Sequence, residues 1–159
     1  MNILLCMPKA NYNWNEWPVL PAGIAYVSSS LKAVGYNVYT LNFITEKRTV
    51  QEAVSQMIVD HDISIIGCGD LVVNYLGIKS ILDAAKEIEP EIITFMGGGF
   101  VTFSPIEAMT LIPSADYGII GEGEITANEL MYAIMNMGDI SKVDGIIYRS
   151  ENGIIIKKR

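Results

Sequence analysis

The sequence predicts an α/β fold in which a doubly wound, five-stranded parallel sheet is followed by a C-terminal β-hairpin. Short apolar runs alternate with segments of helical periodicity along residues 1–138. Several of these runs are nearly continuous in Ile, Leu, Val or aromatic residues, which is typical of strands buried on both faces of a parallel sheet. Residues 143–159 instead contain two apolar runs flanking a polar Ser-Glu-Asn turn, which is typical of a hairpin.

The expected elements form five βα units in order along the chain. The expected strands are residues 2–7, 37–42, 63–68, 91–96 and 116–120. Apolar residues recur at i, i+3, i+4 and i+7, as on the buried face of a helix, over residues 24–34, 50–58 and 78–88. Gly35 follows the first of these helices, at a position where a left-handed residue commonly ends a helix.

Capping-box patterns mark three helix starts. They begin at Thr49, Ser104 and Thr126, each with a glutamate three residues later. In such a box the hydroxyl and the carboxylate satisfy free backbone N–H groups reciprocally. For the last of these helices, we expect Ile125 and Leu130 to form a hydrophobic staple and Gly138 to end the helix.

The topology follows from the chain order. Crossovers between parallel strands are right-handed, so helices should cover both faces of the sheet. We expect the flavodoxin-like strand order 2-1-3-4-5. A length of 159 residues suits one domain, with the five βα units in residues 1–138 and the hairpin in residues 143–159.

The composition limits the classes of function. Half of the residues are hydrophobic and 18% are charged, which excludes a disordered chain. The net charge is −7 and the only basic run is Lys157–Arg159, so we expect neither nucleic acid nor membrane as a main partner. Because the sequence shows no apolar run of ~18 residues and no signal-peptide pattern, we expect a cytoplasmic protein.

The few cysteine and histidine residues argue against a catalytic or metal centre. Cys6 and Cys68 are too few for a disulfide scaffold or a thiolate site, and we expect both to be buried on adjacent strands. His61 follows the second helix, at the edge of the sheet opposite the expected site, and is predicted to be a solvated helix-end residue. We therefore expect no catalytic residue and no metal ligand in this chain.

Ligands of an open α/β sheet bind at the carboxyl ends of its strands. The loops that reach this edge are residues 8–22, 69–77, 97–103 and 121–124. Gly97–Gly99 directly follow a strand, and either let a flat ligand lie on the backbone or form a tight turn; the sequence leaves both open. Gly67-x-Gly69 is not read as a dinucleotide fingerprint, because it follows the third strand and lacks the third glycine.

The other loops at this edge carry polar and aromatic side chains. Glu122 and Glu124 stand beside a helix start, where they either stabilise the helix dipole or accept hydrogen bonds from ligand amides or a ribose. The first loop is longer than the usual ~2–6 residues and contains both tryptophans, Trp14 and Trp17. Such a loop either contacts a partner or ligand or folds back on its own domain.

The glycine runs at 97–99 and 121–123, at this separation, are the most specific part of a wider pattern. The pattern also includes residues 4–8, 20–26, 31–38, 62–67, 100–107, 116–120 and 145–149. With these segments the chain resembles, over essentially its whole length, the N-terminal cobalamin-binding domain of cobalamin-dependent radical S-adenosylmethionine enzymes.

The resemblance implies a cofactor and a set of binding residues. It implies that cobalamin is held base-off with no protein histidine on cobalt, the base tail entering between the first and third strands and the ring edge lying over Gly97–Phe100. The implied cofactor-binding residues are Pro8, Asn11, Gly69, Asp70, Leu71, Val72, Gly97, Gly98, Gly99, Phe100, Gly121, Glu122, Gly123 and Glu124.

The chain departs from the pattern of the wider cobalamin-binding fold at three places. The Asp-x-His-x-x-Gly motif, whose histidine ligates cobalt, is absent, as it commonly is in the radical family. The Ser-x-Leu motif after the third strand is Gly69-Asp70-Leu71, and Phe100 stands where the fourth loop often has histidine. These differences favour one alternative, a cofactor-free docking or substrate-side module of such an enzyme.

The resemblance also implies a partner. The Cys-x-x-x-Cys-x-x-Cys run of the family's radical domain is absent, so the 4Fe–4S cluster and S-adenosylmethionine are expected only in a missing domain, in the same or a partner chain. We expect that domain to dock near Trp14, Trp17 and Val72-Val73. A receiver or flavin domain is a further alternative, but residues 7–22 lack the clustered acids or hydroxyls that these require.

Overall fold

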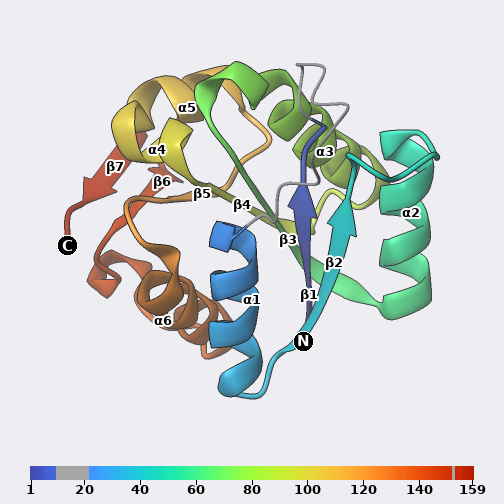
Figure 1. Ribbon diagram of the computed structural model, residues 1–159. Coiled ribbons are helices and arrows are strands. Elements are labelled where there is room, and N and C mark those ends of the chain that lie inside the picture. The colour runs from blue at the N-terminus through green and yellow to red at the C-terminus, as the bar shows by residue number, and fades with distance from the viewer. Residues whose placement is uncertain (10–21, 152) are drawn as a thin grey trace.

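The structure is a computed structural model that describes residues 1–9, 22–151 and 153–159 (Figure 1). Its strands are β1 (Asn2–Met7), β2 (Asn37–Asn42), β3 (Ile63–Gly69), β4 (Ile93–Gly97), β5 (Tyr117–Ile119), β6 (Ile146–Ser150) and β7 (Gly153–Lys157). Its α-helices are α1 (Ala22–Ala33), α2 (Val50–His61), α3 (Tyr75–Ile88), α4 (Gly99–Phe103), α5 (Pro105–Leu111) and α6 (Gly123–Met135), and its short 3-10 helices are η1 (Val72–Asn74) and η2 (Ile140–Lys142). None of the described helices is long and apolar enough to cross a membrane.

The strands form one mixed, seven-stranded sheet in the order β2-β1-β3-β4-β5-β6-β7. Strands β1 to β5 run parallel, whereas β6 pairs antiparallel with both β5 and β7. The α/β class was predicted, but the extent of the sheet was not, because the hairpin continues the sheet instead of standing beside it. Gly118 of β5 lies opposite Ile147 of β6, and an ideal β-carbon on Gly118 would stand 2.6 Å from Ile147 Cγ2, so the glycine makes room for this pairing.

Helices cover both faces of the sheet (Figure 1). Helices α1 and α6 pack on one face, and α2, α3, α4 and α5 pack on the other, each layer around its own buried cluster. Successive residues of β1 alternate between the clusters: Ile3 and Leu5 face α1 and α6, while Leu4 and Cys6 face the other layer. Both faces of β1 are therefore buried, which explains its continuous apolar sequence.

The predicted helix ends are only partly confirmed. Thr49 forms the predicted capping box with Glu52, and Gly35 adopts a positive φ of 96° after α1. Ser104 precedes α5 but makes no side-chain cap. At the end of α6, Met137 takes the left-handed conformation (φ 46°) that was expected of Gly138.

The predicted start of α6 was wrong. The helix begins at Gly123, so Thr126 lies inside its first turns, fully buried, with its hydroxyl unpaired. Ile125 is 61% exposed and forms no hydrophobic staple. The earlier start follows from packing, because a β-carbon on Gly123 would lie 2.9 Å from Val27 Cγ2 of α1; the glycine lets α6 begin against α1 directly after β5.

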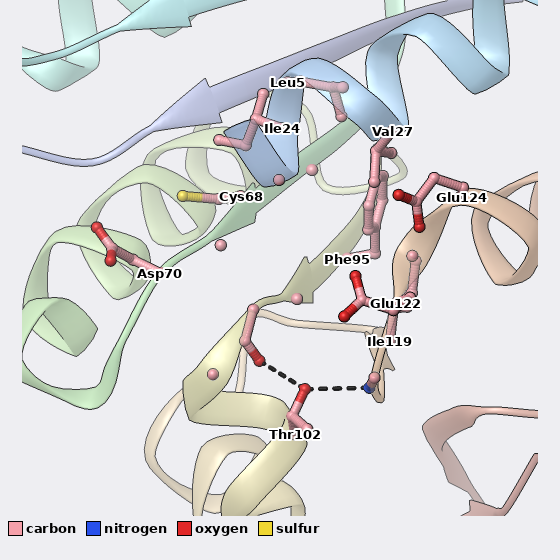
Figure 2. Close-up of a pocket in the computed structure, with 18 of the residues that line it drawn as sticks. Leu5, Ile24, Val27, Cys68, Asp70, Phe95, Thr102, Ile119, Glu122 and Glu124 are labelled. Carbon is pink, nitrogen blue, oxygen red and sulfur yellow. Dashed lines mark hydrogen bonds between the residues drawn. The ribbon is translucent and has the colours of Figure 1, made fainter. Parts of the chain in front are cut away.

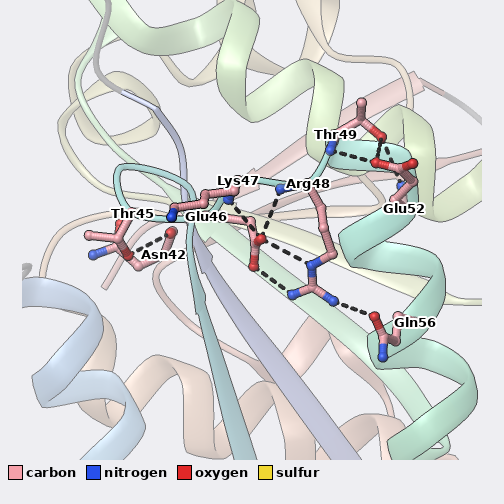
Figure 3. Close-up of polar contacts among 8 residues, drawn as sticks. All are labelled: Asn42, Thr45, Glu46, Lys47, Arg48, Thr49, Glu52 and Gln56. Atoms are coloured by element: carbon pink, nitrogen blue, oxygen red, sulfur yellow. Dashed lines mark hydrogen bonds and ion pairs between the residues drawn. The ribbon is translucent and has the colours of Figure 1, made fainter.

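The loop between β2 and α2, residues 43–49, is held by its own side chains (Figure 3). The Glu46 carboxylate accepts hydrogen bonds from the backbone N–H groups of Lys47 (2.8 Å) and Arg48 (2.9 Å) and from Arg48 Nε (3.0 Å). These bonds, with that of the Arg48 guanidinium first, lower the pKa of Glu46 to about 2. Arg48 also donates to Gln56 of α2, which ties the loop to the helix.

The cysteine and histidine predictions are confirmed for position. Cys6 and Cys68 are register partners on adjacent strands, and both are buried. His61 ends α2 at the amino end of β3, where its ring stacks on Tyr39 at a centroid distance of 4.3 Å.

Candidate functional site

A pocket of about 350 Å³ opens at the carboxyl ends of β1, β3, β4 and β5, on the face of the sheet covered by α1 and α6 (Figure 2). This is the edge at which open α/β sheets bind ligands, and it includes the point between β1 and β3 where the strand order reverses. The pocket is lined by Leu5, Gly23, Ile24, Val27, Gly67, Cys68, Gly69, Asp70, Phe95, Gly97, Gly98, Gly99, Thr102, Phe103, Ile119, Gly121, Glu122, Gly123 and Glu124.

The interior of the pocket is apolar. Its lining includes Leu5, Phe95 and Ile119 from the strands and Ile24 and Val27 from α1. The Phe95 ring crosses β3 at Gly67, where an ideal β-carbon would stand only 2.2 Å from the ring atom Cζ. Glycine at position 67 is therefore what allows the ring to lie flat in this place, and any larger residue would displace it.

The loops after β3 and β4 meet backbone to backbone at the rim. Gly98 has a φ of 82°, and a β-carbon there would lie 2.9 Å from the Asp70 carbonyl oxygen. The same carbonyl accepts a hydrogen bond from the Phe100 N–H at 3.1 Å. A side chain at Gly98 would both strain the backbone and separate these loops.

Thr102 connects the loop after β4 to the loop after β5. Its hydroxyl donates to the Gly98 carbonyl (2.9 Å) and accepts from the Gly121 N–H (3.0 Å), as the dashed lines in Figure 2 show. Both hydrogen-bonding functions of this hydroxyl are thus used within the protein. One side chain therefore fixes the spacing of the two glycine loops.

The carboxylates at the site differ in their availability. Asp70 Oδ1 accepts from the Leu71 N–H (2.7 Å) and Oδ2 accepts from Asn74 Nδ2 (2.8 Å), so this side chain organises the start of η1. Figure 2 shows Glu122, in the loop after β5, and Glu124, in the first turn of α6, by contrast, turned toward the pocket. Carboxylates in that position can accept hydrogen bonds from hydroxyl or amide groups of a ligand.

Cys68 contributes little polarity to the pocket. Its side chain packs in the cluster on the opposite face, beneath α3. Desolvation, with smaller effects of Cys6 and Asp70, raises the thiol pKa well above its usual value, so the group stays neutral. Among the described residues, no group of three or more His, Cys, Asp or Glu side chains gathers in a way that could hold a metal ion.

The structure brings most of the predicted site residues together. Those that line the pocket are Gly69, Asp70, Gly97, Gly98, Gly99, Gly121, Glu122, Gly123 and Glu124. Leu71 and Val72 are about half exposed at the same edge but do not line the pocket, and Pro8 is buried, near Gly77 of α3. Asn11 lies outside the described residues, as do Trp14 and Trp17.

The side chain of Phe100 does not line the pocket, in contrast to the prediction. It was expected at the ring edge of the cofactor, but it is 2% exposed in the cluster beneath α2 to α5. Its ring meets that of Tyr75 edge to face at 6.2 Å. Because the first turn of α4 points this side chain away from the pocket, Phe100 is a core residue.

Sequence reasoning missed the apolar lining of the pocket. Leu5, Phe95 and Ile119 were indistinguishable from core residues, since the sequence does not show where a buried strand face is left uncovered. The only sequence signal for this lining was the pair Ile24 and Val27, which lie three residues apart at the start of a helix.

Apolar side chains are also exposed at this edge of the sheet. Leu71, Val72 and Val73, from the segment that leads into α3, are between 53% and 56% exposed, and Phe103 of α4, which lines the pocket, is 85% exposed. Exposed apolar groups that gather at one edge of a domain commonly mark an interaction surface.

Known proteins are similar to this chain in sequence and in fold. The family model described as "B12 binding domain" matches residues 17–131. Over 98% of its length the chain is 31% identical to the anaerobic magnesium-protoporphyrin IX monomethyl ester cyclase of Rubrivivax gelatinosus, and it spans 29% of that protein.

Two solved structures of radical S-adenosylmethionine enzymes superpose on 99% of the chain. The methyltransferase TsrM of Kitasatospora setae, with cobalamin and a 4Fe–4S cluster bound, has a TM-score of 0.85 at 17% identity, and the chain covers 28% of it. The cobalamin-dependent enzyme OxsB, with aqua-cobalamin and S-adenosylmethionine bound, has a TM-score of 0.80 at 21% identity, and the chain covers 22% of it. At these identities the structures show a shared fold.

Proposed function

This chain belongs to the B12-binding domain family, and from that premise we propose that it is the cobalamin-binding module of a radical S-adenosylmethionine enzyme. The observation that carries the proposal is the apolar pocket at the carboxyl edge of the sheet, bordered by glycine loops. A flat macrocycle needs backbone without side chains beneath its edge, and a buried aromatic tail needs an apolar cavity. The residues of this edge fit both requirements.

In the proposed complex, the nucleotide tail of the corrinoid enters the pocket between the sheet and α1, past Gly69 and Asp70. The ring edge lies over the backbone of Gly97–Gly99, and the loop from Gly121 to Glu124 lies nearby. The missing side chain at Gly98 supports this arrangement indirectly: a β-carbon there would lie 2.9 Å from the Asp70 carbonyl oxygen, so the glycine lets the loops after β3 and β4 meet and holds Gly97–Gly99 at the rim of the pocket. When bound, the corrinoid supplies the reactive cobalt centre, while this chain binds and orients it.

We propose that the corrinoid is held base-off and without a protein histidine on cobalt. The tail cannot occupy the pocket and ligate cobalt at the same time. The chain contains a single histidine, and His61 ends α2 at the amino end of β3, whereas the pocket lies at the carboxyl ends of the strands. No histidine of this chain can therefore replace the base.

The proposed partner is a radical domain, in the same or another chain. The chain spans 29% of the Rubrivivax gelatinosus cyclase, 28% of TsrM and 22% of OxsB, and TsrM and OxsB are radical S-adenosylmethionine enzymes. The exposed apolar side chains of Leu71, Val72 and Val73, at the same edge of the sheet, and of Phe103, which lines the pocket, would be covered by such a domain. Covering them would also exclude water from the reactive face of the corrinoid.

Titration of the folded chain with hydroxocobalamin tests the proposal. We expect a saturable change in the absorption spectrum and co-elution of corrinoid with protein on gel filtration. After reduction to the Co(II) state, the electron paramagnetic resonance spectrum should lack the nitrogen splitting that an axial base or histidine produces. The variant His61→Ala should give the same spectrum.

The second candidate function is a docking or substrate-side module that has lost the cofactor. Two observations favour it: Phe100, at the position where relatives of the wider fold often carry histidine, is buried, and the Asp70 carboxylate is engaged within its own loop. Well-folded protein that binds no corrinoid in the titration would establish this reading in place of the first.

A further inference from the structure

We propose that the outer edge of β7 is a homodimer interface, at which β7 pairs antiparallel with β7 of a second copy of this chain. The proposal does not rest on the proposed function, because β7 lies at the opposite end of the sheet from β1 and β3. Three features of this strand support it: an edge that no described strand covers, a run of isoleucines, and charges of opposite sign at the two ends.

The backbone of β7 has hydrogen-bonding groups to offer at its outer edge. β7 is the last strand of the sheet, beyond β6 (Figure 1), and within the described residues it pairs with β6 alone. Successive residues of a strand direct their N–H and C=O groups to opposite edges. The Lys157 carbonyl accepts a hydrogen bond from the Gly145 N–H (2.8 Å), just before β6, so Lys157 faces β6. Ile154 and Ile156 therefore direct their N–H and C=O groups to the outer edge, where a further strand can bind them.

The side chains of β7 favour pairing with a protein strand. Ile154, Ile155 and Ile156 are each half-buried, so part of every side chain remains for a partner to cover. Sheets commonly protect an edge strand with charged residues or proline, and these three positions carry neither. The other edge strand, β2, is more polar, with asparagine at both ends and threonine between them. The β7 edge is therefore the one that is suited to pairing.

The charges at the two ends of β7 identify a second copy as the partner. Glu151 precedes the strand, Lys157 ends it, and Arg159 follows two residues later. Glu151 and Lys157 are six residues apart, or about 20 Å along an extended strand at ~3.4 Å per residue, so they do not pair within one copy. In an antiparallel β7 pair centred on Ile155, Glu151 of each copy lies opposite Arg159 of the other and diagonal to its Lys157. The edge is thus complementary to itself, as a two-fold interface requires.

This register also fits the backbone and leaves the corrinoid pocket open. With the two-fold axis at Ile155, Ile154 of one copy lies opposite Ile156 of the other, and both direct their N–H and C=O groups toward the partner strand. Because β7 runs parallel to β5, the parallel strands of the two copies run in opposite directions. The two pockets then open at opposite edges of one continuous sheet, and no residue of β7 lines the pocket.

Sedimentation velocity of the folded chain, over a wide range of protein concentration, tests the proposal. We expect a reversible rise from the monomer mass to twice that mass and no larger species, because one β7 edge in each copy is consumed by the pairing. Backbone hydrogen exchange in residues 153–157 should slow as the dimer forms. A monomer at every concentration, or assembly that continues past two copies, would overturn the proposal.

A charge variant and its matched control test the contact between the strand ends. Glu151→Lys places like charges opposite each other at both ends of the paired strands and should weaken dimerisation by roughly tenfold. Glu87→Lys, at an exposed position of α3, changes the net charge by the same two units, from −7 to −5. A less negative chain repels its copy less, so this control should not weaken the dimer. Equal dimerisation of the two variants would overturn the pairing of the ends.

A mixture of two variants tests the antiparallel arrangement itself. The double variant Lys157→Glu and Arg159→Glu should be monomeric where the wild-type chain is dimeric. Mixed with Glu151→Lys, it should form a heterodimer, because each contact then joins a basic end to an acidic end. Failure of the two well-folded variants to associate would overturn the antiparallel pair. Hydroxocobalamin titration of the same variants should match wild type, so absence of corrinoid binding in a dimeric chain would tell against the proposed function and not against the dimer.

Discussion

Two kinds of loop stand at the same edge of this sheet. The β2–α2 loop, residues 43–49, satisfies its own polar groups: Glu46 binds Arg48 and two backbone N–H groups, and Thr49 and Glu52 cap α2 (Figure 3). The short connections after β4 and β5 carry glycine at positions 97–99, 121 and 123, and the side chain of Thr102 joins them (Figure 2).

The difference shows that a loop can be well ordered without being available to bind a ligand. A loop whose carboxylates and amides are already paired has no capacity left for a ligand, although it is well ordered by its own bonds. A loop of glycines leaves its backbone bare, and it must be positioned by neighbours, here by Asp70 and Thr102. Changes in the glycine loops should therefore affect binding, whereas changes in the β2–α2 loop should affect only stability.

The largest effect is expected from Gly98→Val. The β-carbon would meet the Asp70 carbonyl oxygen at 2.9 Å, and the backbone conformation (φ 82°, ψ −169°), which is essentially restricted to glycine, adds strain of about 1–3 kcal/mol. Corrinoid binding should be abolished in protein that remains folded, as measured by absorption titration. Gly35→Val is the matched control: its φ is 96° and a β-carbon there has nothing within 4 Å, so it should lose stability and keep binding. Binding at wild-type strength in Gly98→Val would make this residue a turn glycine only.

A smaller effect is expected from Thr102→Val, which at constant shape removes the hydrogen bond to the Gly98 carbonyl and the one from the Gly121 N–H, and with them the link between the two glycine loops. The free energy of unfolding should fall by about 1–2 kcal/mol, and corrinoid affinity should fall by roughly three- to tenfold, because the loops are less well fixed before binding. Thr110→Val is the control, since the Thr110 hydroxyl donates only to the Ile106 carbonyl of its own helix. Equal affinities for both variants would show that Thr102 does not position the site.

Thr49→Ala should affect the other loop alone. It removes the capping box of α2 and should lower the free energy of unfolding by about 1 kcal/mol, measured by urea denaturation. Corrinoid affinity should stay within twofold of wild type, because the loop after β2 does not line the pocket. A large loss of affinity would show that the β2–α2 loop also contributes to corrinoid binding.

The smallest effect concerns pH and Glu46. Its pKa is lowered from 4.5 to about 2 by Arg48 and the backbone N–H groups, so its stabilising contribution is present above pH 4.5 and is lost as the pH falls toward 2. Glu46→Gln should therefore be less stable than wild type at pH 6, and the difference should shrink at pH 2.5. Urea midpoints at the two pH values measure it; because the Arg48 side chain that pairs with the carboxylate is 38% exposed, the expected shift is small. A difference that grows in acid would contradict the assignment.

A structural feature could be predicted from the sequence when it depends on residues that lie close together in the chain. The capping box at Thr49 and the left-handed Gly35 were predictable because each involves residues within a few positions of each other. Thr126 carried the same capping signal, but contact between Gly123 and Val27, far apart in the chain, started α6 one turn earlier.

The site shows the same division. The glycine loops were predictable because parallel strands place all their carboxyl ends at one edge. The pocket was not, because it depends on Phe95 of β4 lying over the bare backbone of Gly67, its register partner on β3, which is far away in the sequence. Phe100 was misplaced for a related reason: a position in a motif does not tell which way the first turn of a short helix directs the side chain.

Cys6 and Cys68 are free cysteines on adjacent strands, and their reactivity can report how often the middle of the sheet opens. Burial raises both pKa values, so neither sulfur is present as the reactive thiolate in the folded protein. Alkylation must therefore wait for the strands to separate, and its rate reports how often the centre of the molecule opens. A ligand seated over β1 and β3 should slow that reaction, so mass spectrometry of the alkylated chain could follow binding without any optical signal from the ligand.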